Sequence, residues 1–237
     1  MKSKQKAVWI TGASSGIGKS LSVEFAKNGK NLILTSRKND ALERVKKEIN
    51  NPKISVETIA FDISVIDEIE KNFETISKNY EIECLINNAG VTSFSYAAKD
   101  TVSQIKNIID TNLLGSIYMI KTVLPGMINR KKGTIINIQS VAAKKVFTKS
   151  SAYAASKAGL SAYSQVLREE LREHNIRVID VYPGATKTPI WPNDALEKYS
   201  DRMMSPDEIS KFIFNAYSVN SNMVTEELVI RPMKGDL

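Results

Sequence analysis

Residues 7–18 read AVWITGASSGIG, a short apolar run that passes directly into a glycine-rich loop and then into a helical pattern. Glycine lets the backbone turn tightly and approach a phosphate closely. The first turn of the helix offers free amide N–H groups and the positive end of its dipole to an anion. In this strand–loop–helix context the segment predicts a dinucleotide site, although its glycine spacing departs from G-x-G-x-x-G. The candidate cofactor-binding residues here are Gly12, Ser14, Ser15, Gly16, Ile17 and Gly18.

The same alternation of apolar runs and helical patterns continues along the chain. The expected strands cover Ala7–Ile10, Asn31–Ser36, Ser55–Phe61, Cys84–Asn87, Thr134–Ile138, Arg177–Tyr182 and Glu227–Arg231. Several of them are apolar without alternation, as strands buried on both faces should be. Expected helices cover Ile17–Asn28, Ala41–Asn50, Val65–Lys78, Val102–Asn129, Ala152–Glu173 and Pro206–Ala216. This order predicts an α/β fold of the doubly wound type, with a mostly parallel sheet and helices on both faces. Because no linker or repeat interrupts it, residues 1–237 are expected to form one domain.

Three local signals refine this organisation. Pro125 predicts a kink or an early stop in the helix that surrounds it. The run Ser205-Pro206-Asp207-Glu208 combines a serine cap with proline in the first turn, which marks the start of a helix. The stretch Pro189–Met204 has the least regular pattern and is long enough to form a substrate loop or lid.

Composition excludes several kinds of site. The chain has one cysteine, Cys84, and one histidine, His174, so it can form neither an internal disulfide nor a zinc site of the usual ligands. Cys84 lies in the apolar run Ile82–Ile86 and is expected to be a buried, inert thiol. His174 lies in a charged stretch and is expected at the surface. We therefore expect no metal.

The net charge of +7 raises the possibility of nucleic-acid binding. However, the lysines are scattered, and the longest basic run is only Arg130-Lys131-Lys132. A solvated basic surface, suited to an anionic cofactor, is the better interpretation. No apolar run approaches the roughly 20 residues that cross a membrane. The polar segment Met1–Lys6 and the short run after it are not typical of a signal peptide, so a cytoplasmic location is expected.

The end of the second expected strand bears on cofactor choice. In dinucleotide folds, an acidic residue about 20 positions after the glycines binds the ribose 2′-hydroxyl. Here the sequence is Thr35-Ser36-Arg37-Lys38, with no acid. Arg37 can pair with a 2′-phosphate, so NADP(H) is favoured over NAD(H), although an ordinary surface arginine is the alternative. Asp40 is better explained as a helix cap.

A possible acid–base pair lies in the run Tyr-Ala-Ala-Ser-Lys, where Tyr153 and Lys157 are four residues apart. Residues at this spacing share one face of a helix. A nearby cation favours the phenolate and lowers the phenol pKa from about 10, which suits proton transfer near neutral pH. Ser140 lies upstream and could donate to the same substrate oxygen as Tyr153.

Taken together, these motifs resemble the short-chain dehydrogenase/reductases in their shorter, single-domain form. The resemblance covers nearly the whole chain and includes Thr11–Gly18, Asp62, Asn87-Asn88-Ala89-Gly90, Asn112, Ser140, Tyr153, Lys157 and Pro183–Thr188. It implies a seven-stranded Rossmann-type sheet. It also implies a homodimer or homotetramer packed through the two long helices, Val102–Asn129 and Ala152–Glu173.

The resemblance implies a catalytic set of four residues. Tyr153 would be the general acid in reduction, and Ser140 would polarise the substrate carbonyl. Lys157 would bind the nicotinamide ribose and lower the pKa of Tyr153. Asn112 would hold a water that relays protons to Lys157.

It also implies further cofactor contacts. The Asp62 side chain would contact adenine, and Thr188, with the backbone near Thr186, would hold the nicotinamide carboxamide. The ribose and the sheet would be contacted by Asn88, Ala89 and Gly90. The remaining cofactor-binding candidates are Pro183 and Gly184.

These observations favour an NADP(H)-dependent oxidoreductase that interconverts a carbonyl and a secondary alcohol, with Tyr153 as general acid/base. The alternatives are an NAD-dependent alcohol dehydrogenase of the same fold and a non-catalytic dinucleotide-binding regulator. The substrate is expected to be a small molecule, an uncharged ketone or one of mixed polarity. Its pocket is expected to form from Thr92–Ala97, Val141–Phe147 and Pro189–Met204. The candidate substrate contacts are Ser140, Val141, Tyr153, Ile190 and Trp191.

Overall fold

A single parallel sheet organises the molecule. The computed structural model describes residues 4–219 and 222–237. Its seven strands have the order β3-β2-β1-β4-β5-β6-β7 and all pair in parallel. The strands are β1 (Gln5–Thr11), β2 (Asn31–Ser36), β3 (Val56–Ala60), β4 (Tyr80–Asn87), β5 (Gly133–Ile138), β6 (Ile176–Pro183) and β7 (Glu227–Ile230). The order reverses direction between β1 and β4, where ligands bind in folds of this type.

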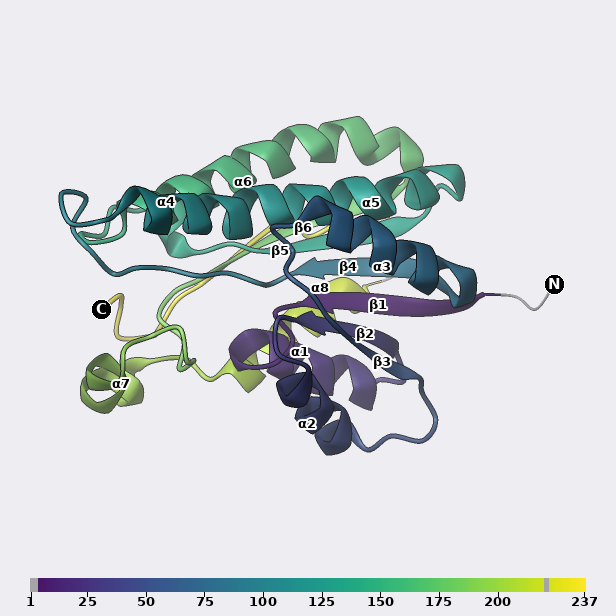
Figure 1. Cartoon of the computed structure of the whole chain (residues 1–237), viewed down its shortest axis with the longest axis horizontal. Coiled ribbons are helices and arrows are strands. Elements are labelled where there is room, and N and C mark those ends of the chain that lie inside the picture. Colours follow the sequence, from purple (N-terminus) through teal and green to yellow (C-terminus); the bar gives the residue numbers. More distant parts are fainter. Residues whose placement is uncertain (1–3, 220–221) are drawn as a thin grey trace.

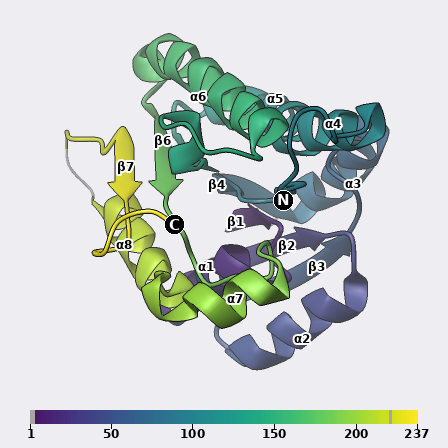
Figure 2. The same cartoon turned by 90° about the vertical axis from the view of Figure 1, so that its left-hand side faces the viewer.

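Helices cover both faces of the sheet, as the sequence predicted (Figure 1). One layer consists of α1 (Gly16–Lys27), α2 (Asn39–Ile49) and α8 (Pro206–Ser218), and the other of α3 (Ile66–Asn79), α4 (Val102–Ile109), α5 (Ser116–Asn129) and α6 (Ser151–Leu171). Figure 2 shows the two layers on opposite sides of the strands. Strand β1 packs against both: Val8 and Ile10 contact one apolar core, and Ala7 and Trp9 the other. This double burial explains why the strand is apolar without alternation.

The long helix expected over Val102–Asn129 is interrupted. A π-helical segment, Asp110–Gly115, separates α4 from α5. Gly115 lets this segment pack closely against the backbone of Ile63, because an added Cβ would lie 2.8 Å from the Ile63 carbonyl oxygen. Pro125 predicted a kink or an early stop; it lies inside α5, which continues to Asn129, so the helix does not stop there. The observed interruption lies before α5, where Gly115 contacts Ile63, and not at the proline.

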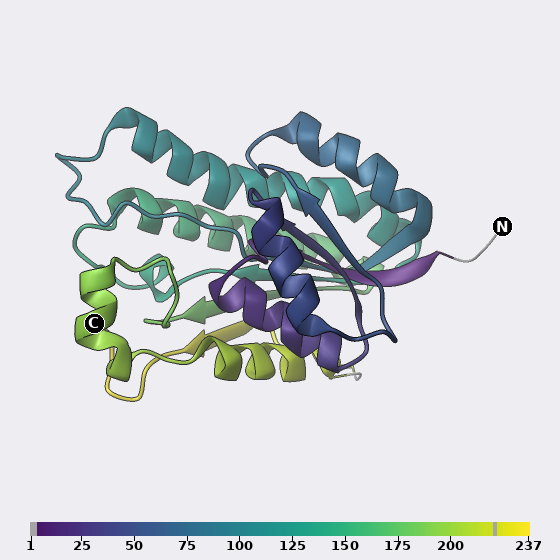
Figure 3. The ribbon, with the colours of Figure 1, turned by 60° about the horizontal axis from the view of Figure 1, so that its bottom comes forward.

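The stretch Pro189–Met204, expected to be irregular, contains a short helix, α7 (Asn193–Tyr199), and a 3-10 turn, Ser200–Arg202. Figures 1 and 2 show α7 near the C-terminus of the chain, and Figure 3 shows the same helix at the left, beside the C label. None of the α7 residues is buried. Its apolar residues, Ala195, Leu196 and Tyr199, are only partly buried, and seven residues are too few for a clear helical period, which explains why the sequence pattern did not reveal it.

Other element boundaries differ from expectation in local ways. The start signal of α8 is confirmed: the Ser205 side chain accepts a hydrogen bond from the Asp207 amide at 3.2 Å. Asp40 does not cap α2, because Lys38 occupies the cap position and Asp40 lies in the first turn. Strand β4 begins at Tyr80, four residues before the expected start at Cys84. Glu81 and Glu83 alternate with the apolar side chains there and hid this part of the strand from the sequence pattern. Within the described part of the chain, no helix is long and apolar enough to cross a membrane.

Candidate active site

A cavity of about 930 Å³ lies at the carboxyl ends of the strands. It collects side chains from loops that are far apart in the sequence. Most of the residues singled out from the sequence line it: Gly12, Ser14, Ser15, Gly16, Ile17, Arg37, Asp62, Asn88, Ala89, Gly90, Ser140, Val141, Tyr153, Lys157, Pro183, Gly184, Thr186, Thr188, Ile190 and Trp191. Gly18 and Asn112 do not line the cavity; they contact residues that do, Asn88 for Gly18 and Val91 for Asn112.

The glycine loop is packed directly against the loop that follows β4. Gly12 has a φ of +64°, and a Cβ there would lie 2.7 Å from the Ala89 Cα. A Cβ on Gly18 would lie 2.3 Å from Asn88 Nδ2. That amide nitrogen donates to the carbonyl oxygens of Thr11 at 3.0 Å and Gly12 at 3.1 Å. Gly18 therefore allows Asn88 to hold the loop, and the loop in turn presents the first turn of α1 to the cavity.

One end of the cavity is basic. Arg37 and Lys38 follow β2, and Arg44 reaches the same end from α2. Arg37 was expected at the cofactor site from the sequence, whereas Arg44 was not. The signal that could have found it is helical spacing, because Ala41 and Arg44 lie three residues apart on one face of α2 and both line the cavity.

Asp62 also lines the cavity, and Ser64, two residues further along the same turn, orients its carboxylate. Its carboxylate oxygen Oδ1 accepts hydrogen bonds from the Ser64 amide at 2.9 Å and the Ser64 hydroxyl at 2.8 Å. The Asp62 amide donates to Glu68 Oε2 at 2.9 Å. These bonds orient the carboxylate before any ligand is bound.

Ser140, Tyr153 and Lys157 meet at the centre of the cavity. The Ser140 hydroxyl oxygen accepts from the Ala142 amide at 3.1 Å, and Ser140 also hydrogen-bonds to the Tyr153 phenol. The Lys157 ammonium lies 5.9 Å from the centre of the Tyr153 ring. It donates to the carbonyl oxygen of Ile138 at 2.7 Å. The geometry thus places a phenol, a hydroxyl and an amine around one space.

Burial shifts the pKa values of this group. It raises the pKa of Tyr153, an effect that the hydrogen bond from Ser140 partly offsets. It lowers the pKa of Lys157 to about 8, because a charged amine loses its hydration there. The expectation that Lys157 lowers the pKa of Tyr153 is therefore not met in the structure, where desolvation is the larger effect.

Asn112 supports the group from behind. The π-helical segment directs its side chain toward the loop after β4, where Oδ1 accepts from the Val91 amide at 2.8 Å and Nδ2 donates to the Val91 carbonyl at 2.9 Å. Nδ2 also donates to the Ser156 hydroxyl at 3.0 Å, and Ser156 donates to the Tyr153 carbonyl at 2.7 Å. A Cβ on Gly90 would lie 3.4 Å from Asn112 Oδ1 and 3.6 Å from Lys157 Nζ, so both polar atoms flank Gly90.

Comparison with known proteins identifies the family. Residues 6–198 match the family model described as short chain dehydrogenase. The chain belongs to this family. It is 34% identical over 236 residues to the sepiapterin reductase of Chlorobaculum tepidum, covering 96% of each chain. It is also 32% identical over 240 residues to the NADP-dependent 3-hydroxy acid dehydrogenase of Schizosaccharomyces pombe, covering 96% of this chain and 92% of that one.

A solved structure supports the assignment. The closed form of a serine dehydrogenase complexed with NADP+ superposes with a TM-score of 0.89 at 27% identity, covering 98% of this chain and 96% of that one. This short-chain dehydrogenase is therefore an oxidoreductase by family, with a site for a dinucleotide.

The other end of the cavity in this short-chain dehydrogenase is aromatic. Phe94 and Trp191 come from separate loops and stack at 5.0 Å between ring centres, with 27° between their planes. Phe94 has a φ of +48°, a conformation that costs free energy in a residue other than glycine. Trp191 was expected in the pocket, and Phe94 lies within the expected range Thr92–Ala97.

The last residues of the chain also line this end, which the sequence did not reveal. Asp236 forms ion pairs with Lys145 at 2.9 Å and with Arg231 at 2.5 Å. Its backbone carbonyl accepts from Arg202 at 3.2 Å. These contacts join the segment after Ser140, the turn after α7 and the segment after β7. No cluster of three or more His, Cys, Asp or Glu side chains in residues 4–219 and 222–237 is placed to hold a metal ion.

Proposed function

We propose that the protein is an NADP(H)-dependent oxidoreductase that interconverts a carbonyl and a secondary alcohol. The observation that carries the proposal is the convergence of Ser140, Tyr153 and Lys157 on the cavity that also holds the glycine loop. The residues present fit a dinucleotide. Gly12 and Gly16 have φ values of +64° and +54°, a conformation that favours glycine, so no side chain at either position covers the loop, and a basic end follows β2.

When bound, the nicotinamide supplies the hydride, and the residues of this chain supply the proton and the alignment. In the direction of reduction, the Tyr153 hydroxyl gives its proton to the carbonyl oxygen. Ser140 donates a hydrogen bond to the same oxygen and stabilises the charge that develops there. Lys157 would bind the nicotinamide ribose, and a positive charge on it would favour the phenolate that remains on Tyr153, against the desolvation that raises the pKa of the phenol. Asn112 would hold a water that returns a proton toward Lys157.

The other cofactor contacts follow from their places in the cavity. Asp62 would meet the adenine, and Asn88, Ala89 and Gly90 would line the ribose. At the nicotinamide end, Thr188 and the backbone near Thr186 would hold the carboxamide, with Pro183 and Gly184 lining the cavity beside them. Support comes from the loops after β1 and β4, which flank the reversal of strand order, where such cofactors lie.

The first test is a screen of carbonyl compounds for NADPH consumption. Its compounds should include flat and aliphatic ketones, because the substrate end carries Phe94 and Trp191 as well as Val141 and Ile190. For any compound that is reduced, Tyr153→Phe should lower kcat by about 10²–10⁴-fold, since it removes the general acid and leaves the packing intact. Unchanged turnover by Tyr153→Phe would show that another group is the acid.

Preference for NADP(H) is the second part of the proposal. Arg37, Lys38 and Arg44 can surround a 2′-phosphate, and two proteins similar to this one are described with NADP. A charge-assisted bond contributes roughly 1.5–3 kcal/mol. We therefore expect Arg37→Ala to weaken the use of NADPH by about ten- to a hundredfold while leaving that of NADH nearly unchanged, as measured by initial rates.

The alternative is an NAD-dependent alcohol dehydrogenase of the same fold. If the unaltered protein used NADH as well as or better than NADPH, this alternative would replace the proposal. Retained NADPH binding with no turnover of any carbonyl or alcohol would instead favour a non-catalytic dinucleotide-binding regulator.

We also propose that residues 189–204 act as a substrate loop. The support is local: Ile190 and Trp191 line the cavity, and Arg202 contacts the backbone of Asp236 at its edge. Finally, we propose a homodimer or homotetramer. The layer that contains α4 and α6 presents apolar side chains to solvent, with Val102 83% and Val166 60% exposed.

A further inference from the structure

A row of polar residues crosses the sheet one step before the active site. Strand pairing places Asn87 opposite Asn137, Asn137 opposite Asp180, and Asp180 opposite Glu227. The first three side chains are buried, with Asp180 fully inaccessible. The loops that follow these strands carry Asn88, Ser140 and Gly184, so the row lies directly beneath the cavity.

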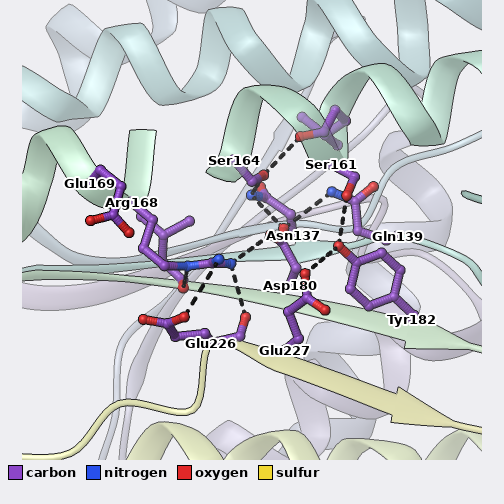
Figure 4. A network of polar contacts seen from close by, with 12 residues as sticks. Asn137, Gln139, Ser161, Ser164, Arg168, Glu169, Asp180, Tyr182, Glu226 and Glu227 are labelled. Atoms are coloured by element: carbon purple, nitrogen blue, oxygen red, sulfur yellow. Dashed lines mark hydrogen bonds and ion pairs between the residues drawn. The ribbon is translucent and has the colours of Figure 1, made fainter. Parts of the chain in front are cut away.

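The centre of this row is a buried ion pair (Figure 4). Arg168 of α6 donates to Asp180 Oδ2 at 2.9 Å, to the Val178 carbonyl at 3.1 Å and to the Glu226 carbonyl at 3.0 Å. Asn137 donates to the other carboxylate oxygen of Asp180 at 3.3 Å. A buried charge is tolerated only when it is paired and hydrogen-bonded in this way. The carboxylate is therefore held in one place by several elements.

Gln139 connects this pair to the active site. Its side-chain nitrogen Nε2 donates to Asp180 Oδ1 at 3.1 Å, and its backbone N–H donates to the Val181 carbonyl at 2.7 Å. Its Oε1 is buried and has no hydrogen-bond partner among the described residues. The orientation of this side chain thus comes from Asp180. The next residue in the chain is Ser140.

The turn that contains Ser140 ends at Lys144, which contacts strands β6 and β7. Lys144 pairs with Glu227 at 2.7 Å and lies 4.2 Å from the centre of the Tyr182 ring. Tyr182 hydrogen-bonds to Ser161 of α6 at 2.8 Å. The turn that contains Ser140 is therefore held at its start by Gln139 and at its end by Lys144.

We propose that Gln139 is a positioning residue: through its bond to the Asp180–Arg168 pair, it holds Ser140 in reach of Tyr153 and of the substrate oxygen. This inference rests on the proposed function. Its physical basis is that a hydroxyl must lie within hydrogen-bonding distance of the reacting oxygen, and a displacement of about 1 Å can cost about a hundredfold in rate.

The test compares Gln139→Leu with Ser210→Ala. Leucine removes the amide, including its unpaired oxygen, with little change in volume. We expect kcat to fall about ten- to a hundredfold while the KM for NADPH stays unchanged. Ser210 is buried in α8, where its hydroxyl donates to the Pro206 carbonyl at 2.8 Å, outside the elements that hold the Ser140 turn, so Ser210→Ala loses a buried hydrogen bond and its kcat should stay unchanged. A general loss of stability would affect both variants.

A double-mutant cycle with Ser140→Ala identifies the route. If Gln139 acts through Ser140, adding Gln139→Leu to Ser140→Ala should cause no further loss of kcat. An equal loss of kcat in both backgrounds, or an unchanged kcat in the single variant, would overturn the proposal.

Amide hydrogen exchange provides a measurement that needs no substrate. The Ala142 amide is hydrogen-bonded to Ser140 Oγ, so Gln139→Leu should accelerate its exchange, whereas Ser210→Ala should not. If the unaltered protein reduces no carbonyl, the proposed function fails while this measurement still tests the position of Ser140. Unchanged exchange at Ala142 would show that Gln139 does not hold it.

Discussion

At the scale of single residues, burial controls the charge of the groups at the centre of the cavity. Lys157 is only 4% exposed, and burial brings its pKa from the ordinary 10.5 to about 8. Between these values the folded protein holds a neutral amine, whereas the unfolded chain binds a proton. Stability should therefore rise with pH across this interval, since the unfolded state binds more protons there.

We expect this effect to be visible against Lys157→Met, which keeps the length of the side chain but not its charge. The free energy of unfolding of the unaltered protein, relative to this variant, should rise by about 3 kcal/mol between pH 8 and 10.5. Urea unfolding at several pH values measures it. A difference that stays flat over this range would show that Lys157 is not buried as a charge below pH 8.

Residue types and spacing were enough to predict most of the cavity lining, because parallel strands bring the loops at their carboxyl ends together. They could not predict the direction of the Tyr153 pKa, because burial depends on elements that are distant in the sequence. Arg44 and Asp236 were missed for a related reason. Each reaches the cavity from a segment with no recognisable motif of its own.

At the scale of elements, the π-helical segment between α4 and α5 places Asn112. The close packing of this segment requires glycine at position 115, because a Cβ added to Gly115 would meet the backbone of Ile63. Gly115→Ala should destabilise the protein by about 1–3 kcal/mol, since backbone gives way less easily than side chains do. It should also lower kcat, because it moves the segment that carries Asn112.

Gly126 of α5 offers a matched control in the same helical run. A Cβ there would meet only the end of the Arg130 side chain, at 3.1 Å. Gly126→Ala should therefore be neutral or stabilising by up to about 1 kcal/mol, as expected for alanine in a helix. Urea unfolding of both variants measures the contrast. Equal effects at the two positions would show that the contact with Ile63 is unimportant.

Long amphipathic elements were predicted well, and short or distorted ones were not. The six expected helices exist, although one of them is divided. The π-helical segment was missed because its close contact at Gly115 is with Ile63, which is distant in the sequence, and α7 was missed because it has only seven residues. Helical periodicity needs a window of about 11–18 residues, so a helix this short leaves no clear pattern.

At the scale of the whole molecule, the alternation of strands and helices was sufficient to predict a doubly wound parallel sheet, because connections of this kind allow few other arrangements. The assembly of several copies is a separate matter. We expect light scattering to give a mass above the 26.3 kDa of one chain. The exposed apolar residues of α4 and α6 are the proposed contact.

Val166→Glu would place a charge in that contact and should shift the mass toward the monomer. Val65→Glu is the control, because Val65 is also an exposed valine but precedes α3, outside the proposed surface. A monomeric mass for the unaltered protein, or equal effects of the two changes, would contradict the proposed interface.

The polar row beneath the cavity has a consequence for folding itself. Parallel apolar strands can pair in several alignments with similar contacts, because one valine or isoleucine replaces another. Asn137 and Asp180 remove this ambiguity. A slip of β5 or β6 by one residue would turn the polar side chain of that strand to the opposite face of the sheet, and a slip by two would leave Asn137 and Asp180 no longer opposite each other. Each unpaired buried group would then cost roughly 1–3 kcal/mol. The residues that support Ser140 thereby also mark the correct alignment of β4, β5 and β6 while the chain folds.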